Sequence, residues 1–169
     1  MKRPLLFAPL LLAAAIARAG GDAPALPERL AGLLDESGLE YSADDDGEAR
    51  LLIDMTDGRD QLVWVRTDLT PLGDGRVFHV YSFAHQSAKP VPADRLSRLA
   101  EENMSLILGA WRLRRGDGEG EDGDDWAWRV VFTAELPDSV DAGQFKTAVI
   151  TVAATADELE KDWTDTDRF

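Results

Sequence analysis

Cysteine is absent from this 169-residue chain, and histidine occurs only twice, at His79 and His85. The lack of thiols excludes disulfides, cysteine nucleophiles and thiolate metal sites, and two histidines are too few for a multi-histidine metal centre. Basic residues are also scarce: 18 lysines and arginines face 32 acidic residues, which gives a formal net charge of −14 at pH 7. Such a charge repels phosphate backbones and anionic lipid surfaces. We therefore expect no cofactor, no dedicated metal centre and no nucleic-acid partner.

The one long apolar run near the start of the chain, residues 5–16, is too short for the roughly 20 residues of a membrane-spanning helix. Lys2 and Arg3 precede it, and Ala17-Arg18-Ala19 follows with small residues at the −3 and −1 positions of a cleavage site. This is the pattern of a secretory signal peptide. We expect residues 1–19 to be removed, residues 20–25 to form a disordered leader, and the protein to be periplasmic or secreted without a stable membrane anchor. An uncleaved N-terminal anchor is the alternative.

The rest of the chain predicts a single α+β domain over residues 26–163, followed by a frayed tail at 164–169. Apolar residues recur at helical spacing in 26–37, 92–108 and 141–163, and the last segment begins with Asp141 and Gln144 placed as a capping box. They alternate with polar residues, or form short apolar runs, in 49–55, 61–67, 77–83, 110–114 and 126–134. The expected architecture is a mostly antiparallel five-stranded sheet with three helices, in the order α-β-β-β-α-β-β-α.

An acidic loop, residues 117–125, separates the last two expected strands and consists only of Asp, Glu and Gly. Such a composition cannot build a core and is typical of a solvated hairpin tip. Oxygen-rich loops also suit calcium, but a calcium loop counted from Asp117 would place Asp122 where its turn demands glycine. A plain flexible loop and nonspecific cation binding both stay open.

Two central strands are predicted to be apolar on both faces. Alternation places Leu62 and Trp64 on one face of the first strand, and His79, Tyr81 and Phe83 on one face of the next. An antiparallel sheet with one solvated face should carry polar residues there. The second face is therefore a partner interface, a dimer seam, or a surface buried under the middle helix.

No catalytic constellation is visible in the sequence. The two histidines have serines nearby, but the Gly-x-Ser-x-Gly phrase of a nucleophile elbow is missing. A carboxylate pair could serve a small hydrolase, yet with so many acidic residues a pair arises by chance. We therefore expect a protein that is not an enzyme.

Four phrases of the sequence share an order and pattern with a known family. They are the helix-to-strand phrase 30–41, the phrase Asn-Met-Ser-Leu-Ile-Leu-Gly-Ala-Trp at 103–111, the Leu136-Pro137 exit, and the closing helical stretch 145–163. In these the chain resembles the YbjN family, whose domains look like type III secretion chaperones. The resemblance implies a non-enzymatic, often dimeric module that binds protein segments or regulates. The export signal departs from the chaperone-like members, which act beside a cytoplasmic apparatus.

The expected function is thus an exported protein- or peptide-binding module of this type, with self-association as a homodimer among its options. The residues expected to contact the partner are Leu62, Trp64, His79, Tyr81 and Phe83. Two alternatives stay open: a small periplasmic hydrolase that uses a carboxylate pair, and an acidic cation-binding protein.

Overall fold

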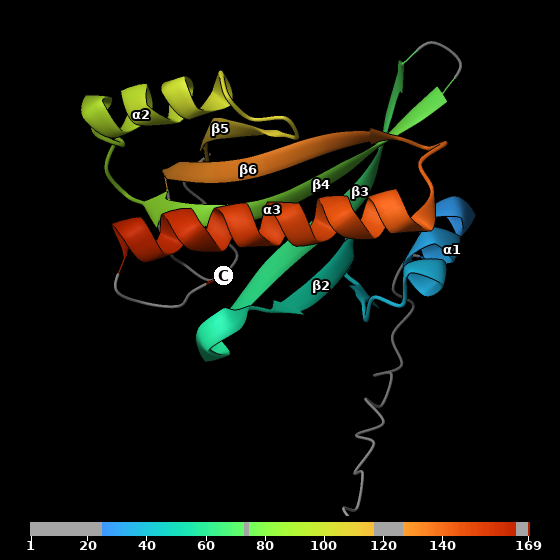
Figure 1. Ribbon diagram of the computed structural model, residues 1–169. Helices are drawn as coiled ribbons and strands as arrows, with labels where there is room; N and C mark the ends of the chain where they lie inside the picture. Colours follow the sequence, from blue (N-terminus) through green and yellow to red (C-terminus); the bar gives the residue numbers. More distant parts are fainter. Residues whose placement is uncertain (1–24, 73–74, 117–126, 165–168) are drawn as a thin grey trace, which may run out of the picture.

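A computed structural model describes residues 25–72, 75–116, 127–164 and 169, which form one antiparallel sheet with three helices (Figure 1). The expected signal peptide and acidic loop lie outside the described residues. The helices are α1 (Glu28–Ser37), α2 (Ala93–Asn103) and α3 (Ala142–Trp163), with a short 3-10 turn at Thr56–Gly58. The strands are β1 (Ser42–Ala43), β2 (Ala49–Asp54), β3 (Asp60–Leu72), β4 (Gly75–Ser87), β5 (Ala110–Arg115) and β6 (Trp128–Pro137).

The strands lie in the order β1-β2-β3-β4-β6-β5, and every neighbouring pair is antiparallel. The α+β class and the three helices are confirmed, but the sheet has six strands and not five. The additional strand β1 pairs only Ser42 and Ala43 with β2. A tight turn produces it: the Asp44 carboxylate accepts the amide of Glu48 at 2.8 Å, and Gly47 adopts φ +77°. Two residues are too few to show a strand periodicity in the sequence.

Helix α3 covers one face of the sheet, where it runs across β3, β4 and β6 (Figure 1). The Asp141 carboxylate accepts the amide of Gln144 at 2.8 Å, which confirms the N-cap half of the predicted capping box. The apolar stripe of α3 is buried against the inward residues of the strands, and Phe145 meets Phe78 edge to face with ring centroids 6.2 Å apart. This layer between α3 and the sheet is the core of the domain.

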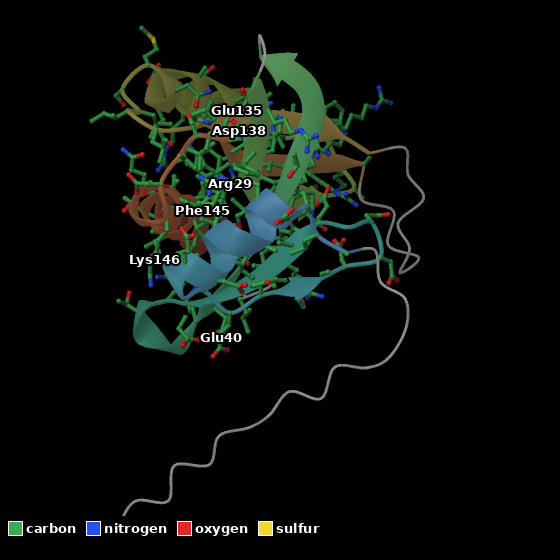
Figure 2. All side chains as sticks on the ribbon, turned by 90° about the vertical axis from the view of Figure 1, so that its right-hand side faces the viewer. Arg29, Glu40, Glu135, Asp138, Phe145 and Lys146 are labelled. Carbon is green, nitrogen blue, oxygen red and sulfur yellow. The ribbon has the colours of Figure 1, made fainter. Side chains whose placement is uncertain are left out.

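Helix α1 is fastened to the start of α3 by hydrogen bonds to main-chain oxygens. Arg29 donates to the carbonyls of Asp138 and Val140 at 3.0 and 2.7 Å, and Lys146 on α3 donates to the carbonyl of Ser37 at 2.9 Å (Figure 2). Its buried leucines belong to the same core as the α3 stripe. Helix α1 therefore adds to the layer that α3 forms.

Helix α2 ends at Asn103, so the expected helix at 92–108 is too long. The Asn103 side chain bonds both main-chain groups of Trp111, accepting from its amide at 2.7 Å and donating to its carbonyl at 3.1 Å. These bonds connect the last residue of α2 to β5. Met104 and Ile107, expected on the apolar helix face, are 89 % and 104 % exposed. Gly109 then turns the chain at φ +80°, where a Cβ atom would lie 2.7 Å from the carbonyl oxygen of Thr133.

The middle helix α2 lies on the same side of the sheet as α3. Arg98 pairs with Asp162 of α3 at 2.8 Å, and the Arg95 guanidinium lies 4.7 Å from the centre of the Trp163 ring. Leu99 is buried in the common core. The alternative that α2 buries the second face of the sheet is therefore wrong. None of the three described helices covers that face, which we name the open face.

Candidate functional site

The open face carries an aromatic cluster that consists of Trp64, Tyr81 and Phe83. Trp64 and Tyr81 are cross-strand partners on β3 and β4, and their rings stack at 5.8 Å with an interplanar angle of 13°. Phe83 meets both rings edge to face, at 5.1 Å from Trp64 and 5.9 Å from Tyr81. Cross-strand pairing thus places three aromatic rings in contact. All three side chains are partly exposed.

The five residues predicted to contact a partner, Leu62, Trp64, His79, Tyr81 and Phe83, lie together on the open face. The residues that alternate with them, among them Val63 and Val80, are buried in the core. A register shift between Phe83 and His85 reverses this alternation at the end of β4. His85 consequently turns to the helix side, where its ring lies 5.3 Å from that of Trp163. The two histidines therefore lie on opposite faces and cannot form one site.

Five arginines share the open face with the aromatic cluster, a feature that sequence reasoning missed. The strand register aligns Arg50 with Trp64, Arg66 with His79, Arg112 with Val131, and Arg114 with Arg129. The alternation of residues along each strand predicts which face of the sheet each arginine lies on. The sequence does not predict that these arginines lie close together, because this depends on β6 lying between β4 and β5.

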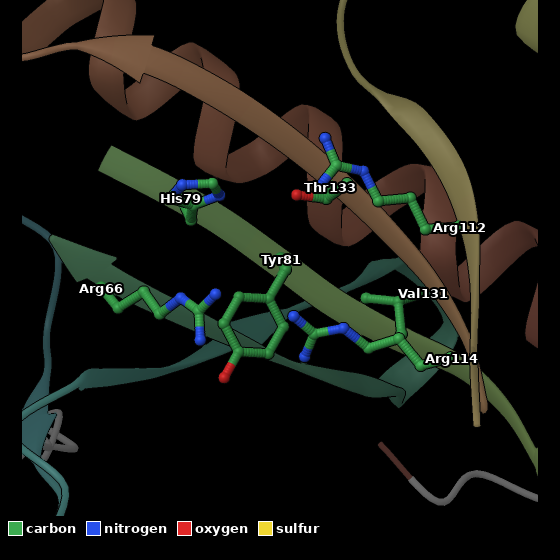
Figure 3. Close-up of a pocket in the computed structure, with 7 residues that line it drawn as sticks. All are labelled: Arg66, His79, Tyr81, Arg112, Arg114, Val131 and Thr133. Atoms are coloured by element: carbon green, nitrogen blue, oxygen red, sulfur yellow. The ribbon is translucent and has the colours of Figure 1, made fainter. Parts of the chain in front are cut away.

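The arginines help to line a shallow basic pocket in the sheet surface. Figure 3 shows Arg66 and Arg114 on two sides of Tyr81, and the Arg114 guanidinium lies 5.8 Å from the centre of that ring. Val131 and Thr133 of β6 are 2 % and 6 % exposed and form the floor. The pocket is lined by Arg66, His79, Tyr81, Arg112, Arg114, Val131 and Thr133.

Two carboxylates from the chain itself balance part of this positive charge. Glu48 accepts a hydrogen bond from the Tyr81 hydroxyl and lies 3.8 Å from Arg66. Glu135 binds Arg112 and lies 3.8 Å from Nδ1 of His79. Burial, and then the hydrogen bond to Glu48, raise the pKa of Tyr81, so its hydroxyl stays a donor.

The positive charge of Arg114 is not balanced by a described carboxylate. No described carboxylate forms an ion pair with it, although acidic residues far outnumber basic ones in the chain.

The C-terminal residue of the chain contacts the aromatic cluster. The Phe169 ring lies 6.2 Å from the Phe83 ring at an interplanar angle of 50°. The Arg129 guanidinium also lies 5.5 Å from the centre of the Phe83 ring. The open face thus accepts an additional aromatic side chain beside its own three.

The clearest buried carboxylate pair lies on the helix side and is occupied by basic groups. Arg59 binds Asp157 at 2.7 Å and Glu160 at 3.1 Å, and Lys161 binds Asp157 at 2.7 Å. Burial opposes ionisation of Asp157, but the hydrogen bonds from Lys161 and Arg59 outweigh it and lower its pKa. The two carboxylates are therefore paired with Arg59 and Lys161 on the helix side of the sheet.

The described residues contain no group of three or more His, Asp or Glu side chains that could hold a metal ion. Nor do they contain a helix long and apolar enough to cross a membrane. Comparison with models of known protein families and with curated proteins finds no match.

Proposed function

We propose that this protein is an exported, non-enzymatic module that binds a segment of another protein on the open face of its sheet. The observation that carries the proposal is the open face: the three described helices all lie on the other side of the sheet, and this side presents the aromatic cluster. Aromatic residues and arginine are the types enriched at protein interfaces, where they contribute most of the binding energy.

The chemistry of the open face favours a partner segment with aromatic and acidic residues. The contact between Phe169 and Phe83 supports an aromatic group on the partner. The five arginines favour negative charge on it. A second copy of the chain is less favoured, because an isologous dimer would bring the two sets of arginines together. The resemblance to the YbjN family also supports a binding module, and membership in that family is part of the proposal.

Export is the part of the proposal that rests on the sequence alone. The charged start, the apolar run and Ala17-Arg18-Ala19 support cleavage after Ala19. N-terminal sequencing of the protein from its native cell should begin at Gly20. An intact Met1 on protein purified from the cytoplasm would refute export.

The binding role is tested by comparing substitutions on the two sides of the sheet. Wild type, the double variant Trp64→Ser/Phe83→Ser and the control Ile150→Ser would each capture partners from an envelope extract. Ile150 is a 43 % exposed apolar residue on α3. Its replacement by serine is therefore also a change from an apolar to a polar side chain, but on the helix side of the sheet. We expect a partner that wild type and the control retain and that the open-face variant loses. Equal capture by all three proteins would refute the proposal.

Sedimentation of the same three proteins distinguishes the kinds of partner. We expect wild type to be a monomer. A dimer that the open-face variant dissociates and the Ile150→Ser control keeps would assign the face to a second copy. Circular dichroism and urea melts would check that each variant is folded.

A further inference from the structure

We infer that the basic pocket is a subsite for a carboxylate group of the partner segment, with Arg114 as its principal ligand. The inference rests on the proposed function, because the pocket adjoins the aromatic cluster through their shared residue Tyr81. It assigns chemistry to the segment: an acidic side chain lies close to the aromatic residue that packs on the cluster.

Side chains that line the pocket already pair with two carboxylates of the chain that lie outside its lining, Glu48 and Glu135. The Tyr81 hydroxyl donates a hydrogen bond to Glu48, which lies 3.8 Å from Arg66, and Arg112 binds Glu135, which lies 3.8 Å from Nδ1 of His79. Arg114 lies on the opposite side of Tyr81 from Arg66 (Figure 3). The guanidinium fork is matched to a carboxylate, which it binds through two parallel hydrogen bonds. Arg114 is the pocket's arginine that lacks such an ion pair within the described chain.

The arrangement also positions the Arg114 side chain before a ligand arrives. Its guanidinium lies against the Tyr81 ring at 5.8 Å, and Tyr81 is itself fixed by stacking on Trp64 and by its bond to Glu48. A side chain that is already ordered loses less entropy when it binds.

A protein carboxylate fits the molecule better than a polyanion does. The whole chain carries a formal charge of −14, so a nucleic acid or an anionic membrane would be repelled over most of the surface. A short acidic segment meets the local positive field of the pocket and little else. The Debye length of about 8 Å at physiological salt confines the repulsion from more distant acidic residues.

The test uses two synthetic peptides, acetylated and amidated, with the sequences Trp-Glu-Ser-Glu-Phe and Trp-Gln-Ser-Gln-Phe. Their binding to the purified protein would be followed by NMR titration. We expect wild type to bind the acidic peptide about tenfold more tightly than its amide counterpart, as a charged hydrogen bond would give. Nonspecific electrostatics predicts the opposite order, because the protein is strongly acidic.

Three variants assign the preference to one side chain. Arg114→Gln should reduce the preference to about twofold, and Arg114→Lys should restore part of it because the charge returns. The matched control is Arg115→Gln: Arg115 is the next residue of β5, and its side chain lies over Trp128, away from the pocket. This control should keep the full preference.

The failures of the two proposals are distinguishable. Equal binding of both peptides, weakened for both by Trp64→Ala, would overturn the carboxylate subsite and leave the proposed function standing. Binding that Trp64→Ala leaves unchanged would overturn both. Displacement of the acidic peptide by inorganic phosphate, but not by acetate at equal ionic strength, would reassign the pocket to phosphate and overturn the inference.

Discussion

The two faces of this sheet are built from the same strands but use their residues differently. On the helix side, Val63, Phe78 and Phe132 are buried under α3 as an apolar layer. On the open side, aromatic rings are partly exposed and bordered by arginines. Burial of apolar side chains stabilises the fold, whereas the rings of the open face are partly exposed to solvent. Under the proposed function, the residues that stabilise the fold and those that bind the partner lie on opposite sides of one sheet.

The sharpest test of this comparison replaces one phenylalanine on each side. Phe145→Ala should lower the free energy of unfolding by about 3–5 kcal/mol, because the side chain is fully buried beside Phe78 and leaves a cavity. Phe83→Ala on the open face should cost about 1 kcal/mol or less. Urea melts measure both values. Equal losses would mean that the open face is part of the stabilising core.

The contribution of each ion pair on the helix side to the free energy of unfolding should increase with its burial. Arg59→Ala should lower the free energy of unfolding by about 3 kcal/mol, because it leaves Asp157 and Glu160, whose side chains are 4 % and 0 % exposed, without their arginine. The control is Arg98→Ala, which removes a pair with Glu102 and Asp162 on the surface. We expect the control to keep the wild-type unfolding midpoint. A larger loss in the control would contradict the ranking by burial.

Acid should weaken the helix side through Asp157. Its pKa is lower in the folded protein than in the unfolded chain, so its ionisation adds stability above the unfolded value of about 3.9. That contribution is lost as the pH falls below this value and through the folded pKa. Urea midpoints measured from pH 6 downward should therefore fall less steeply for Asp157→Asn than for wild type. Parallel pH profiles would show that Asp157 contributes nothing to acid sensitivity.

The smallest effect on stability is expected where the proposed effect on binding is large. Trp64→Ala should change the free energy of unfolding by less than about 1 kcal/mol, because Trp64 lies on the uncovered face. The same variant should lose partner capture. A loss of several kcal/mol, measured by urea melts, would instead make Trp64 a structural residue.

The local periodicity of the sequence predicts most of the elements but not where they meet. The strand pattern at 61–67 and 77–83 and the N-cap at Asp141 were readable because each depends on neighbouring residues. The end of α2 was not, because the bonds from the Asn103 side chain to the main chain of Trp111 depend on where β5 lies relative to the helix. The expected partner residues share a face as alternation predicts.

The basic pocket could not be predicted from the sequence either, because it depends on the order of the strands in the sheet. It joins Arg66 on β3 to Arg114 on β5 across two intervening strands, and β6 enters the sheet between β4 and β5. Nothing in the spacing of arginines along the sequence encodes that insertion. Strand alternation alone would place each arginine on the open face of its own strand. Only the order of the strands shows that they converge.

The two edges of the sheet have a consequence for aggregation. An exposed edge strand offers unpaired main-chain groups to which another chain can add. Here one edge strand, β1, has only two residues, and the other, β5, carries Arg112, Arg114 and Arg115. A short strand offers too few groups, and like charges repel when two such edges approach. The domain is thereby protected against edge-to-edge polymerisation at high concentration, even though its aromatic cluster is left uncovered by the helices.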